Sequence, residues 1–229
     1  MENLLREYLE RAFSDRGEVS MTGNGPVVTL SREFGCPSKL IAQRLATELN
    51  RQPRREGQHG WRVISKEVVE ATARQLGMDP VDAVHILNFA GKGLIEDVLA
   101  SFTTSYVNDH RVRKTILNVV RSIADQGHVI LVGRGGVGIL RNRPNTLHVR
   151  LLAPTEWRIR SVCESKKISV TEASAMIDEI DRNRVKLLEL VTGEKFSPFL
   201  FDVAYHCHSL SNDEIVSSIM GLLKARNLA

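Results

Sequence analysis

Residues 26–39, Pro-Val-Val-Thr-Leu-Ser-Arg-Glu-Phe-Gly-Cys-Pro-Ser-Lys, decide the fold. The first six residues form an apolar, β-rich run that predicts a buried strand over 26–31. A helix is predicted directly after it, over 38–49, from apolar residues at helical spacing, which are Leu40, Ile41, Leu45 and Leu49. A turn between a parallel strand and a helix directs backbone N–H groups and the positive end of the helix at one point. Such a turn is an anion site, and phosphate is its usual ligand.

The alternation of short β-rich runs and longer helical stretches continues along the chain. Further strands are predicted over residues 61–65, 128–132, 147–152 and 201–206. Helices are predicted over residues 4–14, 66–77, 80–100, 110–126, 155–165, 171–191 and 212–226. This order indicates βαβ units and a mostly parallel sheet, hence an α/β fold. One domain over residues 26–229, with an inserted helical part and an N-terminal helical extension over 1–25, fits the pattern.

The composition is that of an ordinary globular protein, with 229 residues of which 42% are apolar and 25% charged. Its 16 glycines, 7 prolines and 3 cysteines exclude collagen-like, disordered and disulfide-framework chains. The sequence lacks an apolar run of about 18 residues, the length that spans a membrane. Charged residues interrupt the leucines at the start of the sequence, which excludes the apolar core of a signal peptide. We therefore expect a cytoplasmic protein with no membrane partner.

The net charge of +4 comes from 31 lysines and arginines against 27 acidic residues. These basic residues are spread along the chain, so the charge alone is weak evidence for a polyanionic partner. Arginine outweighs lysine, and its planar fork suits phosphate oxygens. Several arginines stand close together in the sequence: Arg51, Arg54 and Arg55; Arg111 and Arg113; Arg158 and Arg160; Arg182 and Arg184. Solvated helix faces are the alternative interpretation of each group.

The turn at residues 31–39 departs from the phosphate loop of the G-x-x-x-x-G-K-[ST] type. Pro37 stands where the second glycine is expected, and proline removes one N–H donor from the loop. Ser38 or Lys39 lies near the place of the loop lysine. Leu40 has no hydroxyl with which to bind magnesium. A plain strand-to-helix turn therefore remains an alternative.

A glycine-rich segment, Val-Gly-Arg-Gly-Gly-Val-Gly at residues 132–138, follows the predicted strand over 128–132. Ligands of parallel α/β sheets bind at the carboxyl ends of the strands. Gly133 and Gly135 allow a substrate to approach the backbone, and Arg134 is suited to bind a phosphate. A tight turn that caps a helix is the alternative interpretation.

A second set of charged residues surrounds the predicted helices over 155–165 and 171–191. It consists of Arg158 and Arg160 on the first helix and of Asp181, Arg182 and Arg184 on the second. Phosphoryl transfer needs positive charge around the moving group, and a closing lid often supplies it. Ion pairs on helix surfaces are the alternative interpretation.

The sequence predicts neither a metal site nor a redox pair. Its cysteines, Cys36, Cys163 and Cys207, are far apart, and no C-x-x-C motif is present. His206 and His208 flank Cys207, but no third ligand accompanies them.

Taken together, these motifs resemble the cytidylate kinase-like branch of the P-loop nucleoside monophosphate kinases over roughly residues 26–225. The resemblance is carried by Thr-Leu-Ser-Arg-Glu-Phe-Gly at 29–35 with the helix at 41–46, and by Val-Gly-Arg-Gly at 132–135. Further along it is carried by residues 147–149, Ala153-Pro154, Arg158-Ile159, Asp181 to Arg184 and Phe201-Asp202. It implies a P-loop NTPase-like three-layer sandwich, in which a five-stranded parallel sheet has helices on both faces and carries an inserted helical substrate and lid part.

The resemblance also implies a reaction and roles for particular residues. The reaction is transfer of the γ-phosphoryl group from ATP, with Mg2+, to CMP or dCMP. The implied catalytic residues are Arg158, Arg184 and Lys39. The implied ATP-binding residues are Ser31, Arg32, Gly35, Cys36, Pro37, Ser38, Lys39 and Leu40. The implied substrate-binding residues are Ser65, Gly133, Arg134 and Gly135, and the lid residues are Arg160, Asp181 and Arg182.

Two hypotheses of different classes stay open. The first is a nucleoside monophosphate kinase, for a pyrimidine nucleotide. The second is a catalytically weak or inactive regulatory protein that binds nucleotides on the same fold, which Pro37, Leu40 and Ser65 favour. A kinase for another small acceptor, or nucleic-acid binding through the arginines at 51–62, is a lesser alternative. We expect nucleotides as partners and do not expect a nucleic acid; a homo-oligomer is compatible with the sequence.

Overall fold

The computed structural model describes residues 25–53, 59–65, 68, 70–71 and 109–229. The predicted helices over 4–14 and 80–100, most of the one over 66–77, and all of the predicted extension except residue 25 lie outside these ranges.

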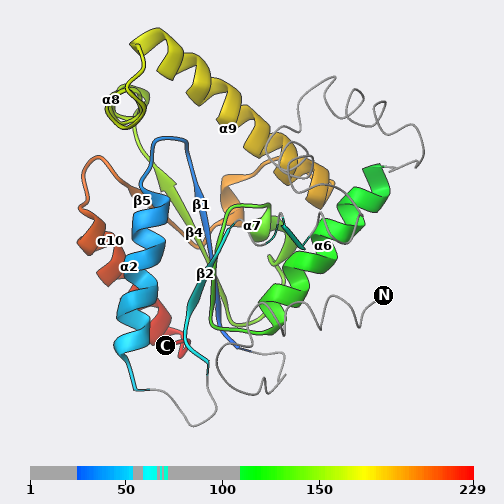
Figure 1. Cartoon of the computed structure of the whole chain (residues 1–229). Helices are drawn as coiled ribbons and strands as arrows, with labels where there is room; N and C mark the ends of the chain where they lie inside the picture. The colour runs from blue at the N-terminus through cyan, green and yellow to red at the C-terminus, as the bar shows by residue number, and fades with distance from the viewer. Residues whose placement is uncertain (1–24, 54–58, 66–67, 69, 72–108) are drawn as a thin grey trace.

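A five-stranded parallel sheet forms the centre of the described chain (Figure 1). Its strands are β1 (Val27–Arg32), β2 (Arg62–Ile64), β3 (Val129–Val132), β4 (Thr146–Leu152) and β5 (Val203–His206). The spatial order is β2-β3-β1-β4-β5, and every neighbouring pair is parallel. Leu30 pairs with Val132 on one side and with Val149 on the other, so the carboxyl ends of β1, β3 and β4 meet at one edge. The predicted α/β fold with a parallel sheet is confirmed.

Helices cover both faces of the sheet. They are α2 (Ser38–Arg51), α6 (Asp109–Asp125), α7 (Gly136–Ile139), α8 (Thr155–Lys166), α9 (Val170–Thr192) and α10 (Asn212–Ala225), with a short 3-10 turn, η1 (Pro198–Leu200). Ser169 and Ser211 begin α9 and α10 with capping boxes, in which the serine and a glutamate three residues later satisfy each other's backbone N–H groups. Gly193 ends α9 in the left-handed conformation that glycine adopts without strain.

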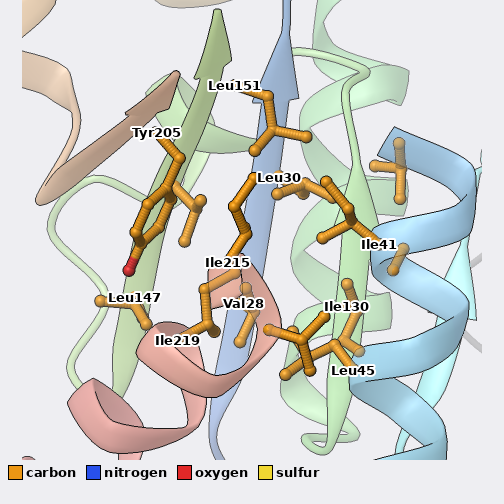
Figure 2. Packing of buried hydrophobic residues seen from close by; sticks show 14 of the residues in the cluster. Val28, Leu30, Ile41, Leu45, Ile130, Leu147, Leu151, Tyr205, Ile215 and Ile219 are labelled. Atoms are coloured by element: carbon orange, nitrogen blue, oxygen red, sulfur yellow. The ribbon is translucent and has the colours of Figure 1, made fainter. Parts of the chain in front are cut away.

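Two apolar clusters, one on each face, hold the layers together. Figure 2 shows the first, in which α2 and α10 cover side chains such as Val28, Leu30, Ile130, Leu147 and Leu151. The second joins α6 and the C-terminal half of α9 to Val27, Val129 and Leu131. Because side chains alternate along a strand, neighbours such as Val27 and Val28 enter opposite clusters. The chain is therefore a three-layer α/β/α sandwich.

Helices α8 and α9 extend beyond the carboxyl edge of the sheet (Figure 1). They pack on each other through Val162, Ala173 and Ile177, and Phe34 of the β1–α2 turn packs against this small cluster. The helix pair thus covers the turn that the sequence predicts to bind phosphate. In the described part of the chain, no helix is both long enough and apolar enough to cross a membrane.

Cys36 and Cys207 meet in the first cluster, although they are far apart in the sequence. A hydrogen bond to Cys207, together with burial, raises the pKa of the Cys36 thiol. Their separation in the sequence gives no sign of this contact, and both thiols are free. Cys36 joins the turn after β1 to the end of β5 by packing.

Candidate functional site

The carboxyl edge of the sheet opens into a cavity of about 390 Å3, which we call the arginine cavity. Its described lining contains the arginines Arg32, Arg134, Arg150, Arg158, Arg182 and Arg184. Only three acidic side chains, Glu33, Asp178 and Asp181, share the described lining. This excess of guanidinium groups suits a ligand with several negative charges, because arginine binds phosphate oxygens with parallel hydrogen bonds.

Arg32 is the last residue of β1, and its side chain lies against the turn after β3. A Cβ atom at Gly133 would overlap the Arg32 Nη1 atom, so a side chain there would displace this guanidinium. Burial, followed by the charges of Arg184 and Arg134, lowers the pKa of Arg32 to about 9. Within the described ranges, no hydrogen bond or ion pair from the Arg32 guanidinium is found. Arg32 is still charged at neutral pH. The charge of Asp181 acts on it, but no described carboxylate forms an ion pair with its guanidinium.

Arg134 stands in the middle of the turn that leads from β3 into α7. Gly133, Arg134 and Gly135 all have positive φ angles, of 75°, 57° and 70°. This left-handed conformation costs little for glycine but is strained for arginine, and such strain is concentrated at functional sites. Arg134 Nε donates a hydrogen bond to the carbonyl of Ser65 at 3.3 Å, so the predicted substrate-binding residues lie together. Ser65 contributes by its backbone and does not line the arginine cavity.

The carboxylate of Asp181 joins three elements at the side of the cavity. It accepts hydrogen bonds from the backbone N–H of Phe34 at 2.7 Å, from Arg158 Nη1 at 2.7 Å and from Arg184 Nη1 at 3.2 Å. These donors belong to the β1–α2 turn, to α8 and to α9. The carboxylate therefore occupies an anion position at the predicted phosphate loop, with an internal group in place of a ligand.

Arg158 is almost fully enclosed, with 8% of its surface exposed. Besides Asp181, its guanidinium donates to the carbonyls of Ala153 and Phe34 and to the hydroxyl of Thr155. These hydrogen bonds connect the β1–α2 turn to α8. The implied role of Arg158 as a catalytic arginine remains a prediction, and its bonds place it best as a positioning residue.

The predicted ATP-binding residues divide into two groups. Ser31 and Arg32 line the arginine cavity, whereas Gly35, Cys36, Pro37, Ser38, Lys39 and Leu40 are absent from its lining. Within the turn, the N–H of Cys36 donates to the carbonyl of Glu33, and that of Ser38 donates to the carbonyl of Cys36. Gly35 (φ 96°) lies against the backbone of Arg158, and its carbonyl accepts a bond from Ser161 Oγ. Most donors of a phosphate loop are thus taken up by the chain itself.

The turn therefore offers few free backbone donors to the phosphates of a nucleotide. Lys39 and Leu40 are exposed on the first turn of α2, while Ser38 is buried. Magnesium usually keeps several waters and binds through one or two carboxylates plus substrate phosphates. The described residues hold no group of three metal-binding side chains, so the ion would depend on nucleotide phosphates for most of its ligands.

The predicted lid residues occupy different positions. Asp181 and Arg182 line the arginine cavity, Arg182 from an exposed place on α9. Arg160 is exposed on α8 and does not contribute to the lining. The sequence therefore groups Arg158 with Arg160, whereas the fold separates them.

Arg150 is a cavity residue that the sequence analysis misses. It lies on β4 with its guanidinium 4.8 Å from the centre of the Phe196 ring and 5.1 Å from that of Phe201. Glu33 is 3.7 Å away and offsets its charge. An arginine in the middle of a mostly buried strand is itself a signal, because charged residues seldom enter such strands without a partner. The two aromatic residues carry no comparable signal in the sequence.

Comparison with known proteins identifies a family for most of the chain. The model of the cytidylate kinase-like family matches residues 27–204. No curated protein matches the sequence. Among solved structures, an uncharacterized protein from Eubacterium ventriosum has a TM-score of 0.64 at 18% identity, and the match covers 88% of this chain and 99% of that one. Shikimate kinase from Acinetobacter baumannii in complex with shikimate has a TM-score of 0.50 at 12% identity, covering 93% and 100%. At these sequence identities, the structural similarity shows a shared fold and nothing about activity.

Proposed function

The chain belongs to the cytidylate kinase-like family, and on this basis we propose that it transfers the γ-phosphoryl group of ATP to a nucleoside monophosphate, with CMP or dCMP as acceptor. Nucleotide-dependent phosphoryl transfer is the general chemistry of a kinase-like family. The observation that carries the proposal is the arginine cavity at the carboxyl edge of the sheet. Such a transfer depends on positioning and charge neutralisation more than on covalent chemistry by the protein.

In this proposal the residues of the cavity bind and orient the acceptor. Arg134, held by the Ser65 carbonyl, binds the acceptor phosphate, and the glycines beside it let that phosphate approach the backbone. Arg184, fixed by Asp181 and by the carbonyl of Arg32, brings positive charge from α9. Arg158 keeps Asp181 in place, and Arg182 faces the cavity from its exposed rim.

ATP with Mg2+ would supply the phosphoryl group. Lys39 is the proposed donor-side cation, because it is exposed at the start of α2. The domain over residues 26–229 is proposed to act in the cytoplasm with nucleotides as its partners.

The decisive experiment is a coupled assay of ATP consumption with magnesium against a panel of nucleoside monophosphates. Arg134→Asn is the test variant, because asparagine tolerates the left-handed backbone at this position. Arg44→Asn is the matched control, since Arg44 is exposed on α2 and pairs with Asp213 away from the cavity. We expect turnover of one acceptor, a loss of about 100-fold or more in kcat/KM for Arg134→Asn, and unchanged turnover for Arg44→Asn. Equal turnover by both variants would contradict the proposal.

A second candidate function is nucleotide binding without turnover. It is favoured by the β1–α2 turn, whose N–H groups at Phe34, Cys36 and Ser38 are bonded within the chain. Absence of ATP consumption across the panel, together with a rise in melting temperature on addition of CMP or ATP, would support this candidate over the kinase.

A further inference from the structure

We infer that Arg32 is a ligand for the acceptor's phosphate, and that Arg32, Arg134 and Arg184 together form a clamp for a dianionic phosphate monoester. The family resemblance places Arg32 in the ATP-binding loop, whereas its side chain lies toward the turn after β3. The identity of the acceptor rests on the proposed function, whereas the clamp itself rests on the arrangement of the three guanidinium groups.

The Arg32 side chain points toward the β3–α7 turn. Its Nη1 atom packs against Gly133, the first residue of the turn that carries Arg134. The next residue, Glu33, turns toward β4, where it accepts a hydrogen bond from the N–H of Ala153. Arg32 therefore leaves the β1–α2 turn and joins the wall of the cavity formed by the β3–α7 turn.

Arg184 and Arg134 lie close to Arg32 in the cavity. Arg184 Nη1 donates to the carbonyl of Arg32 at 3.2 Å, so the two residues are adjacent. All three arginines line the same cavity. Three cations brought together from β1, the β3–α7 turn and α9 repel one another unless an anion lies between them.

Most of the other arginines of the cavity already have acceptors within the chain. Arg150 is offset by Glu33, while Arg158 and Arg184 share Asp181. Arg134 has the Ser65 carbonyl as an acceptor. In the described part of the lining, Arg32 differs from these four because its guanidinium neither forms an ion pair nor donates a hydrogen bond. A half-buried cation that has no acceptor among the described residues is suited to bind an anionic ligand.

A phosphate monoester fits three guanidinium groups in both charge and number of oxygens. A phosphate monoester carries a charge of about −1.5 to −2 at pH 7 and presents three acceptor oxygens to the protein. One oxygen for each guanidinium matches a clamp of three arginines better than a carboxylate, which has one charge and two oxygens. A donor triphosphate is disfavoured, because residues 35–40 of the turn lie outside the cavity.

The test is calorimetric binding to the full chain, with CMP, cytidine, inorganic phosphate and ATP titrated separately. The proteins are the wild type, Arg32→Ala, Arg32→Met and the control Arg44→Ala, which removes an equal charge from an exposed site. We expect the Kd for CMP and for phosphate to rise by about 30-fold or more in both Arg32 variants, as for other charged hydrogen bonds. We expect the Kd for ATP to change by less than about 3-fold and Arg44→Ala to match the wild type. Thermal unfolding of each variant checks that it folds.

The outcomes separate this inference from the proposed function. A weaker affinity for ATP with unchanged affinity for CMP would place Arg32 on the donor side and overturn the inference. Failure of both CMP and inorganic phosphate to bind the wild type would overturn it as well. Tight CMP binding that is lost in the Arg32 variants, without ATP consumption by the wild type, would uphold the clamp and remove the kinase.

Discussion

The β1–α2 turn and the arginine cavity lie at the same edge of the sheet, but their polar groups are paired to very different degrees. In the turn, backbone donors and Arg158 are bonded to the chain itself, with Asp181 as the shared acceptor. In the cavity, Arg32 has no hydrogen-bond acceptor among the described residues, and Arg134 is held in a strained backbone conformation. A region built for stability satisfies its polar groups internally, whereas a region built for binding leaves that task to its ligand. We therefore expect the proposed phosphate ligand to be bound by side chains of the cavity more than by backbone N–H groups of the turn.

Removal of the Asp181 carboxylate gives the largest expected loss of stability. Asp181→Ala leaves the buried Arg158 and the N–H of Phe34 without their shared acceptor. We expect a loss of about 3 kcal/mol in the free energy of unfolding, as for other broken buried ion pairs. Urea denaturation measures it, with Asp213→Ala as control, because the Asp213 side chain is 80% exposed and should change stability by less than about 0.5 kcal/mol. Equal effects of the two variants would remove the contrast between turn and cavity.

Gly35→Ala tests how closely the turn is packed. Gly35 has φ of 96°, and an added Cβ would lie 3.0 Å from Arg158 Cβ and 3.1 Å from the Arg158 carbonyl oxygen. We expect a loss of about 2 kcal/mol, since strain and crowding act together. Gly221→Ala is the matched control. Gly221 lies in α10 with no neighbour within 4 Å of such a Cβ, so alanine should stabilise by about 0.5–1 kcal/mol. If Gly35→Ala is tolerated as well as Gly221→Ala, the turn is open enough for a phosphate.

Arg32→Met should increase the stability of the ligand-free protein, in contrast to Asp181→Ala and Gly35→Ala. The folded pKa of Arg32, about 9, lies below its ordinary value of 12.5, so the charged side chain costs stability at every pH below 9. This cost should fade as the pH rises through 9. We expect a gain of about 1 kcal/mol at pH 7, seen as a higher melting temperature. A lower melting temperature at pH 7 would make Arg32 a structural residue.

Lys39→Ala gives the smallest expected effect on stability. Lys39 is exposed on α2 and has no contact with the arginine cavity. We expect a change below about 0.5 kcal/mol in the free energy of unfolding and an unchanged Kd for CMP. Its turnover, measured in the same coupled assay, tests the proposed donor role. A tenfold loss of CMP affinity would show that the turn and the cavity act as one site.

The strands were predictable because each is a short apolar run, and those runs lie within about two residues of the observed bounds. The helix over 38–49 was predictable for the same kind of reason, since Ile41, Leu45 and Leu49 are buried as expected. The bonding of the turn was not predictable. The contact between Phe34 and Asp181 joins residues that are 147 positions apart, and no local pattern encodes it. Local reasoning likewise left Arg32 with its sequence neighbours, although its side chain belongs with Gly133.

The strand order has a consequence for how the chain acquires its fold during synthesis. β1 is central, yet both of its neighbours, β3 and β4, come about 100 residues or more after it. At ribosomal rates of about 5–20 residues per second, β1 waits for several seconds before a pairing partner emerges. An apolar strand without partners is exposed to aggregation during that interval. The nascent chain is therefore expected to depend on chaperones until β4 has left the ribosome.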